Sequence, residues 1–451
     1  MNNPRFREDV VRSGITQYTL LKNGLKVVLI PDKLSQVVSS VILYKVGSRN
    51  EACGYTGSTH FLEHMMFMDT SKHSVLNGNG FDQVFKPLGN LTNANTWYDR
   101  TMYFECVPSE YLETCLEIEA DRMRNLKLTQ MDHDSEMTVV RNELERGETE
   151  PDEMMENQKF ATIFREHPYH HPTIGWRSDV EGMPLARLKQ FYDEFYWPNN
   201  AVLFISGNFD TSNALKLVYK HFGKIKLPKK PIPEVYTTEP KQMGQRSFEL
   251  YTQTQLKKLT VAFRLPESTH VDLAAMRILD EILGNSQMPN SPIYKQLIST
   301  GLAFDAHSSL IALKDHSIMS FEVALTDSQS ISSAQRAIEN LINGLKLNLD
   351  SSQSQIVTQA KIDDICKHLS KRKILSAMDG LNLAQELAEY EGRGSWLDYF
   401  DEDSVLASVT VDNVVACVNK YFTSANSTVG KLYPSSQLDD KNFACKEAGH
   451  E

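Results

Sequence analysis

The sequence predicts an α+β protein built from two copies of one unit, each a mainly antiparallel sheet covered by helices. Residues 183–208 and 409–434 share an order of features: an amphipathic helix, an aromatic pair, a short turn ending in Asn, and a strand. The strand-like segments 24–30 and 248–251 also correspond. Similarity at such a long period indicates a duplicated unit. The 451 residues also exceed what one hydrophobic core normally supports.

A linker between the two copies is indicated by residues 227–235 (LPKKPIPEV), which are rich in proline and charge. We therefore expect a first domain at 1–226, a linker at 227–241 and a second domain at 242–451. Within each domain strands cluster near the start and helices follow. This order favours an antiparallel sheet with helices packed against it.

The most informative segment is residues 60–64, His-Phe-Leu-Glu-His. On a helix, His60 and His64 are four residues apart and share a face, so both imidazoles can bind one metal ion. Glu63 lies at the edge of that face, where its carboxylate can reach a metal-bound water without being a ligand. This order of residues is the inverzincin pattern and predicts a water-activating zinc site. The alternative is a helix whose histidines are exposed or hydrogen-bonded in the core.

A catalytic zinc ion usually has three protein ligands and one open position. Residues 134–147 contain no Pro, reach Gly only at the end and have apolar side chains at helical spacing, which predicts a helix. Glu136 and Glu143 are two turns apart on one face of it. The pair suits one ligand and one group that orients the site. The alternative is that both acids are solvated.

The segments around this motif resemble the pitrilysin or insulinase-type zinc metallopeptidases. The half-length members, such as the mitochondrial processing peptidase and its bacterial relatives, are the most similar in size. The resemblance is dense over residues 20–210 and weaker beyond. It is carried by the motif, Glu136, Glu143, and the segments 47–51 (GSRNE), 57–67, 93–96 (NANT), 167–169 (HPY), 175–176 and 196–202.

This resemblance implies a fold like one half of a clamshell and the activity of a zinc-dependent endopeptidase. By it, His60, His64 and Glu143 would bind the zinc ion, Glu63 would be the general base, and Glu136 would support the site. The corresponding helix of the second copy, near residues 275–283, contains acids but no histidine. One zinc ion per chain is therefore expected.

A binding site for a peptide substrate is expected beside the zinc site. Residues 89–97 and 101–107 predict two strands around a turn. The resemblance implies that Asn93 and Ala94 lie on an edge strand to which the peptide adds in extended form. For Asn93 the alternative is ordinary turn chemistry.

The second copy departs from the family pattern. Active members usually carry there an Arg and, seven residues on, a Tyr that face the zinc site, whereas this chain has Leu297 and Phe304. Neither side chain can donate a hydrogen bond. We therefore expect a heterodimer, in which a homologous subunit supplies the Arg and Tyr. The alternatives are a homodimer or monomer that uses other donors, such as Lys295 or His307, and an inactive or weakly active structural or binding subunit.

Composition limits the classes of partner and compartment. The net charge of −11 argues against nucleic acid or an anionic membrane as the main partner. No apolar run reaches the length of a membrane span. The six cysteines include no Cys-x-x-Cys, and the amino-terminal residues lack the apolar core of a signal peptide. We expect the cytoplasm, unless a targeting segment has been removed.

Overall fold

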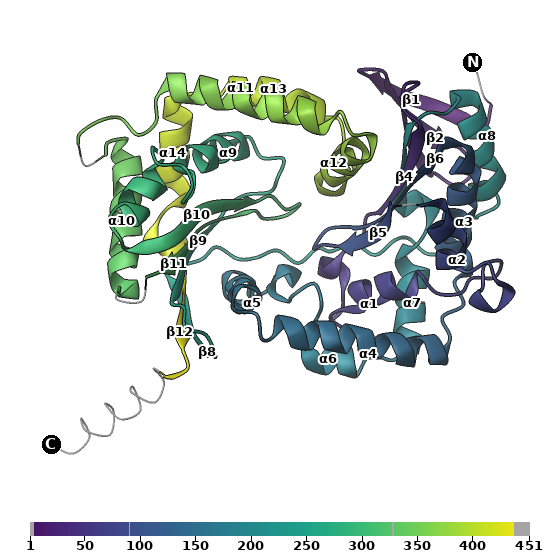
Figure 1. The fold of residues 1–451 in the computed structure, drawn as a ribbon, viewed down its shortest axis with the longest axis horizontal. Coiled ribbons are helices and arrows are strands. Elements are labelled where there is room, and N and C mark those ends of the chain that lie inside the picture. Colours follow the sequence, from purple (N-terminus) through teal and green to yellow (C-terminus); the bar gives the residue numbers. More distant parts are fainter. Residues whose placement is uncertain (1–3, 90, 327–328, 351, 437–451) are drawn as a thin grey trace. The chain divides into compact units, whose positions relative to one another are not determined.

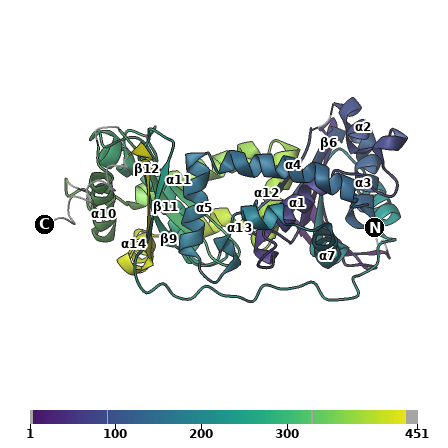
Figure 2. The same ribbon diagram turned by 90° about the horizontal axis from the view of Figure 1, so that it is seen from below.

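The computed structural model describes residues 4–436 except 90, 327–328 and 351. Two compact units, each with one sheet, make up the chain (Figures 1 and 2). The first unit consists of Met1–Leu144, His171–Thr237 and Lys373–Phe400. The second consists of Glu145–His170, Thr238–Arg372 and Asp401–Glu451.

The first unit contains a seven-stranded sheet in the order β1-β2-β3-β7-β4-β6-β5. Only β3 and β7 run parallel, and the other neighbours pair antiparallel. The strands are β1 (Phe6–Arg12), β2 (Ile15–Leu20), β3 (Lys26–Pro31), β4 (Val37–Tyr44), β5 (Leu91–Thr96), β6 (Thr101–Pro108) and β7 (Ala201–Gly207).

Both faces of this sheet are buried, which explains the nearly continuous apolar runs of its central strands. Because successive side chains of a strand point to opposite faces, Val27 and Leu29 of β3 join one core and Val28 and Ile30 join another. Helices from the first half of the chain cover one face, and α12 covers the other. The helices are α1 (Ser58–Met65), α2 (Phe81–Phe85), α3 (Leu112–Asn125), α4 (Gln130–Gly147), α6 (Arg177–Glu181), α7 (Leu185–Phe195), α8 (Thr211–Phe222) and α12 (Gly380–Arg393).

The second unit contains a five-stranded sheet in the order β10-β11-β9-β12-β8. Its strands are β8 (Arg246–Thr252), β9 (Lys258–Arg264), β10 (Ala303–Ile311), β11 (Ile318–Leu325) and β12 (Ser427–Pro434). Here β8 and β12 are the parallel pair. Taken in chain order, β8 to β12 repeat the neighbours and directions of β3 to β7. This match is what a duplicated unit predicts.

Helices α9, α10 and α14 pack with the sheet of the second unit in one core. Helix α5 contacts β8, β9 and β12, and a separate small cluster of Met155, Phe248 and Leu432 packs it against β8 and β12. The helices are α5 (Pro151–Ile163), α9 (Asp272–Leu283), α10 (Ile331–Leu347), α11 (Gln359–Ser376), α13 (Asp398–Ala407) and α14 (Val411–Tyr421).

The predicted α+β class is confirmed, and the helix–turn–strand echo corresponds to α7 with β7 and to α14 with β12. No helix or strand lies between α8 and β8, where the linker was expected. The sequence boundaries at 226 and 242 stay a prediction about the duplicated copies. The compact units exchange two segments between these copies, Glu145–His170 and Lys373–Phe400.

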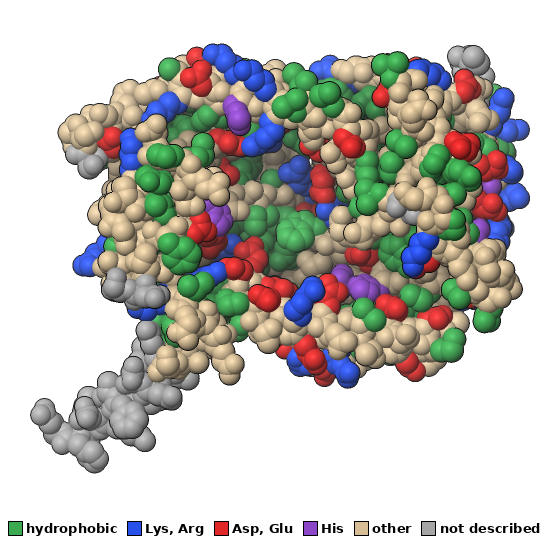
Figure 3. All heavy atoms as spheres, in the orientation of Figure 1, with side chains coloured by type: hydrophobic (Ala, Val, Ile, Leu, Met, Phe, Trp, Pro, Cys, Tyr) green, Lys and Arg blue, Asp and Glu red, His purple; other side chains and the backbone are tan. Residues whose placement is uncertain are grey.

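The surface charges and the helices bear on the expected classes of partner. Acidic and basic side chains are interspersed over the face in Figure 3. Among the described residues no helix combines the length and apolar character that a membrane crossing requires. The expected solvated tail, residues 439–451, lies outside the described residues.

Candidate metal centre

Helix α1 is fixed at its amino-terminal end by a buried carboxylate. Glu51 accepts the backbone N–H of Gly57 and of Thr59, each at 2.7 Å. Two of the amino-terminal N–H groups of the helix are thereby satisfied. Burial raises the pKa of Glu51 to about 8, although these two hydrogen bonds lower it. Gly57 has φ +86°, and a Cβ there would lie 2.4 Å from the Ile174 carbonyl oxygen.

We expect Glu51→Gln to lower the free energy of unfolding of the metal-free protein by about 1–3 kcal/mol, because the single amide oxygen can replace only one of the two carboxyl oxygens that accept a backbone N–H. Urea denaturation measures the change. Glu110→Gln is the control, since Glu110 is exposed. An equal stability of both variants would show that the Glu51 contacts do not hold the start of α1.

The two histidines of α1 lie side by side on the helix face that is turned away from the core. Their ring centroids are 4.9 Å apart. Phe61, Leu62 and Met65 are fully buried and anchor the opposite face of the helix in the core of the first unit. The predicted helix over 60–64 is confirmed, with His60 and His64 on one face.

Helix α4 brings the two predicted acids to this face. The Oε2 atom of Glu143 lies 3.5 Å from Nε2 of His64 and 3.8 Å from Nε2 of His60. Glu136 contacts the opposite edge of the His64 ring, where its Oε2 lies 3.2 Å from Nδ1 of His64. Val140 and Leu144 are buried in the same core and hold α4 in place.

The spacing of these side chains fits the geometry of a zinc site. One ligand atom from each of His60, His64 and Glu143 lies within 4.8 Å of the other two. Zinc–ligand bonds of about 2.0–2.2 Å at tetrahedral angles separate ligand atoms by roughly 3.4 Å, close to the measured 3.5 and 3.8 Å. Two imidazoles and one carboxylate are also a known catalytic zinc set. Within residues 4–436, apart from the four undescribed positions, this is the one such group found.

In the metal-free site the two histidines have pKa values shifted in opposite directions. Burial, and then the neighbouring His64, lower the pKa of His60 to about 4. For His64 burial alone lowers the pKa, but hydrogen bonds to Glu136 and Glu143 and the charge of Glu63 raise it to about 9. At neutral pH His60 is therefore neutral, and His64 carries a proton that a metal ion must displace.

Glu63 is nearly buried beside these candidate ligands, with 8% of its surface exposed. The hydroxyl of Thr96 donates a hydrogen bond to Oε2 of Glu63 at 2.5 Å. Burial raises the pKa of Glu63, whereas the Thr96 bond and the nearby His64 lower it. A desolvated carboxyl with a raised pKa suits proton transfer near neutral pH.

Strand β5 is the edge of the first sheet and pairs only with β6 among the named strands. Asn93 is exposed within β5 and Ala94 is buried. Asn93 therefore lies in the strand rather than in the turn between β5 and β6. Its Oδ1 accepts the N–H of Ala94 at 2.9 Å.

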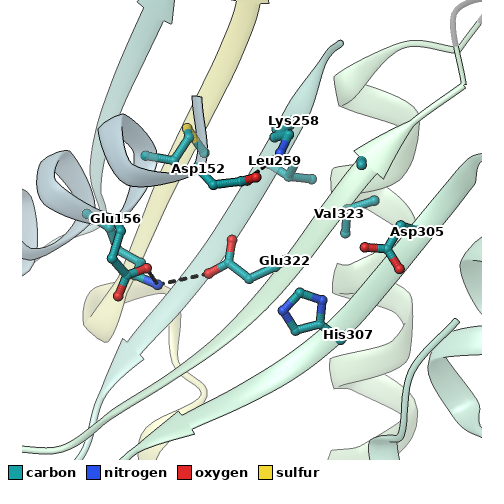
Figure 4. A pocket seen from close by; sticks show the side chains of 11 residues that line it. Asp152, Glu156, Lys258, Leu259, Asp305, His307, Glu322 and Val323 are labelled. Atoms are coloured by element: carbon teal, nitrogen blue, oxygen red, sulfur yellow. Dashed lines mark hydrogen bonds and ion pairs between the residues drawn. The ribbon is translucent and has the colours of Figure 1, made fainter. Parts of the chain in front are cut away.

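Two positions of the second unit depart from the family pattern. Leu297 is buried and Phe304 is half-exposed, and neither offers a donor. Lys295 and His307, the other candidate donors, lie on different cavities. His307 lines a cavity of about 230 Å³ between α5 and the strands β9, β10 and β11 (Figure 4).

Five charged side chains that line the cavity form ion pairs with one another. The buried Lys159 ammonium lies 2.6 Å from Glu156 and 2.9 Å from Glu322. Asp152 pairs with Lys258 in the same way (Figure 4). The Lys159–Glu322 and Asp152–Lys258 pairs join α5 to the sheet of the second unit, so we assign them a structural role.

The sequence did not predict a role for two residues of the site, Glu51 and Thr96. Both belong to segments that the family resemblance singled out, 47–51 and 93–96. Their partners are remote in sequence or lie on another element, and no periodicity indicates such contacts.

Comparison with known proteins covers most of the chain. The family model described as Insulinase (Peptidase family M16) matches residues 26–176, and the one described as Peptidase M16 inactive domain matches residues 183–365. The zinc protease PqqE of Helicobacter pylori is 30% identical over 419 residues, which make up 92% of each chain.

Solved structures agree with this relationship. A protease from Helicobacter pylori superposes with a TM-score of 0.86 at 30% identity, over 93% of this chain and 99% of that chain. The first half of the periplasmic protease PqqL from Escherichia coli has the same fold, with a TM-score of 0.75 at 18% identity over 96% and 95% of the two chains. The chain therefore belongs to the insulinase family of peptidases, M16, of the pitrilysin and insulinase type.

Proposed function

We propose that this chain is a zinc-dependent endopeptidase that hydrolyses extended peptides or small unfolded polypeptides. The observation that carries the proposal is the convergence of His60, His64 and Glu143 from two helices, with the buried carboxyl of Glu63 next to them. The name of the PqqE relative, a zinc protease, supports the choice of metal. The direct test is cleavage of an unfolded peptide by the purified protein, which should stop with a chelator and return with zinc.

The imidazoles and one carboxylate would hold the metal ion, one per chain. Both histidines would use Nε2, the atoms that face Glu143. Glu136 contacts Nδ1 of His64 and would fix the orientation and the basicity of that ring. A bound zinc ion supplies a Lewis acid that activates water and polarises the peptide carbonyl.

The proton transfers fall to Glu63. Its carboxylate would take a proton from the attacking water and then deliver it to the nitrogen of the leaving amine. The raised pKa of this buried group makes its carboxylate a stronger proton acceptor, and the acid so formed can donate the proton to the amine. Each transfer uses the same carboxylate, so no second acid is required.

The substrate would add to β5 as a further strand. An edge strand offers unpaired backbone groups, and pairing with them needs an extended peptide but little specific sequence. Asn93 and Ala94 would provide this contact, at the middle of a strand whose last residue is hydrogen-bonded to Glu63.

We further propose that the active form is a heterodimer with a homologous subunit that supplies an Arg and a Tyr, because Leu297 and Phe304 cannot stabilise an oxyanion. Loss of one such donor typically costs about 2.7–4 kcal/mol of transition-state stabilisation. Co-purification from the native source should yield an equally abundant chain of similar length that raises the rate of cleavage. A rate unchanged by any partner favours the alternatives, a homodimer or a monomer.

An inactive or weakly active structural or binding subunit remains the second candidate function, favoured by the same two apolar residues. Metal analysis and turnover separate the two candidates. An enzyme binds zinc and turns over in the presence of its partner, whereas a structural subunit leaves the rate unchanged when it is added or its zinc is removed.

Zinc affinity should rise with pH up to about 9. The pKa of His64 in the metal-free fold is raised from 6.5 to about 9, so protonation of His64 stabilises that fold below pH 6.5 and this contribution is lost as the pH rises through 9. Because zinc binds the neutral ring, each pH unit between these values should raise the affinity roughly tenfold. Competition with a chelating dye at pH 6, 7 and 8 measures it, and an affinity independent of pH contradicts it.

The redox state of the cysteines supports a proposal for the cellular compartment of the protein. The five cysteines among the described residues are all free thiols, three of them partly or fully exposed, which suits a reducing environment such as the cytoplasm. Quantifying thiols in protein isolated under alkylating conditions tests this.

A further inference from the structure

The side chain of Thr96 connects the last residue of β5 to the carboxylate of Glu63, 33 positions earlier in the chain. We propose that Thr96 is a positioning residue, whose hydroxyl orients the Glu63 carboxylate for proton transfer. The inference rests on the proposed function, because it names the group that acts through the general base. Thr96 itself would touch neither zinc nor substrate through its hydroxyl.

Because of the Thr96 hydrogen bond, the two carboxylate oxygens of Glu63 have different roles. Oε2 accepts the Thr96 hydroxyl at 2.5 Å, which leaves Oε1 to accept a proton from water. A flexible glutamate would lose rotamer freedom on each catalytic cycle. The Thr96 bond restricts that freedom in advance, and pre-organised groups of this kind avoid a reorganisation cost during the reaction.

The position of Thr96 is itself held by the backbone. Thr96 pairs with Thr101 at the end of the β5–β6 ladder. The two residues that follow are tied to the segment before α1, since the N–H of Ser48 donates to the carbonyl of Trp97 at 3.1 Å and that of Arg49 donates to Tyr98 at 3.0 Å. Backbone hydrogen bonds on both sides of Thr96 therefore fix the position from which its hydroxyl reaches Glu63.

The same strand is the proposed binding site of the peptide. A substrate that pairs with Asn93 and Ala94 would further order β5, and the ordered strand carries the hydroxyl that fixes the base. The bond thus links substrate binding to the orientation of the proton acceptor. Its loss should affect turnover rather than affinity.

The kinetic test uses Thr96→Val, which keeps the β-branched shape and removes the hydroxyl, and Thr96→Ser, which restores it. For Thr96→Val we expect kcat to fall about 10- to 100-fold, the range for outer groups of metal sites, with KM and zinc content unchanged. Thr96→Ser should recover most of the rate. Thr19→Val is the matched control, because the hydroxyl of Thr19 also donates to a carboxylate at 2.5 Å, that of Asp9 on β1.

An unchanged kcat in Thr96→Val overturns the inference, as does an equal loss in Thr19→Val or a loss of zinc together with kcat. Crystal structures of wild-type and Thr96→Val protein give a readout that needs no activity. The wild-type structure should contain the Thr96–Glu63 bond, and the variant should show the carboxylate displaced or in several orientations. A carboxylate in the same place in both structures also overturns it. A wild-type protein without zinc-dependent cleavage contradicts the proposed function instead, and the crystallographic comparison then decides the Thr96 inference alone.

Discussion

We expect Glu63→Gln to bind zinc like the wild-type protein and to lose about 10²- to 10⁴-fold in kcat, the usual contribution of a general base. The amide keeps the size of the side chain and can still accept the Thr96 hydroxyl, so the fold around α1 should be retained. It cannot take a proton from water at neutral pH. Metal analysis and steady-state kinetics on the same sample measure both properties.

Glu136→Gln is the informative comparison for this result. Glu136 contacts only the Nδ1 side of His64, so its loss should weaken zinc binding about 10- to 100-fold and have less effect on kcat at saturating zinc. If Glu63→Gln cleaves peptides at the wild-type rate, Glu63 is not the base. If it instead loses the metal, Glu63 belongs to the ligands.

The second large effect is expected for Glu143→Ala. Its carboxylate lies against both imidazoles, and without it two ligands remain, fewer than the three protein ligands that catalytic zinc usually has. Zinc content should fall from about one ion per chain to a small fraction of that after dialysis against a weak chelator, and activity should fall with it. Elemental analysis and kinetics provide the measurement.

Glu145→Ala is the matched control for Glu143→Ala. Glu145 is exposed and lies two residues further along α4, so the substitution removes the same charge from the same helix at a different angle. Its zinc content should equal that of the wild-type protein. Equal zinc loss in both variants would point to general electrostatics, and full zinc retention in Glu143→Ala would remove Glu143 from the ligands.

Helical periodicity was sufficient to predict which side chains share a face within each of the two helices. The four-residue spacing in α1 and the seven-residue spacing in α4 each place two groups on one face, and the structure brings these faces together. Periodicity could not say which acid of α4 faces the shared Nε2 atoms, since Glu136 and Glu143 lie on the same face. That distinction came from the family resemblance, and the distances agree with it.

The exchange of segments between the copies could not be read from the sequence. Apolar spacing in α12 predicts a buried face but does not say which sheet covers it, and this helix belongs to the first unit although it follows most of the second. The contacts of Glu51 and Thr96 could not be predicted either, because each consists of hydrogen bonds to another element. A single hydrogen bond to another element leaves no pattern in the chain.

The measurement that tests the account most directly is an anomalous difference map from crystals of the zinc-loaded protein, recorded on both sides of the zinc absorption edge. We predict one peak per chain, bonded to Nε2 of His60, Nε2 of His64 and a carboxylate oxygen of Glu143 at about 2.0–2.2 Å. A peak at other residues, or Glu143 turned away from both imidazoles, would contradict the assignment.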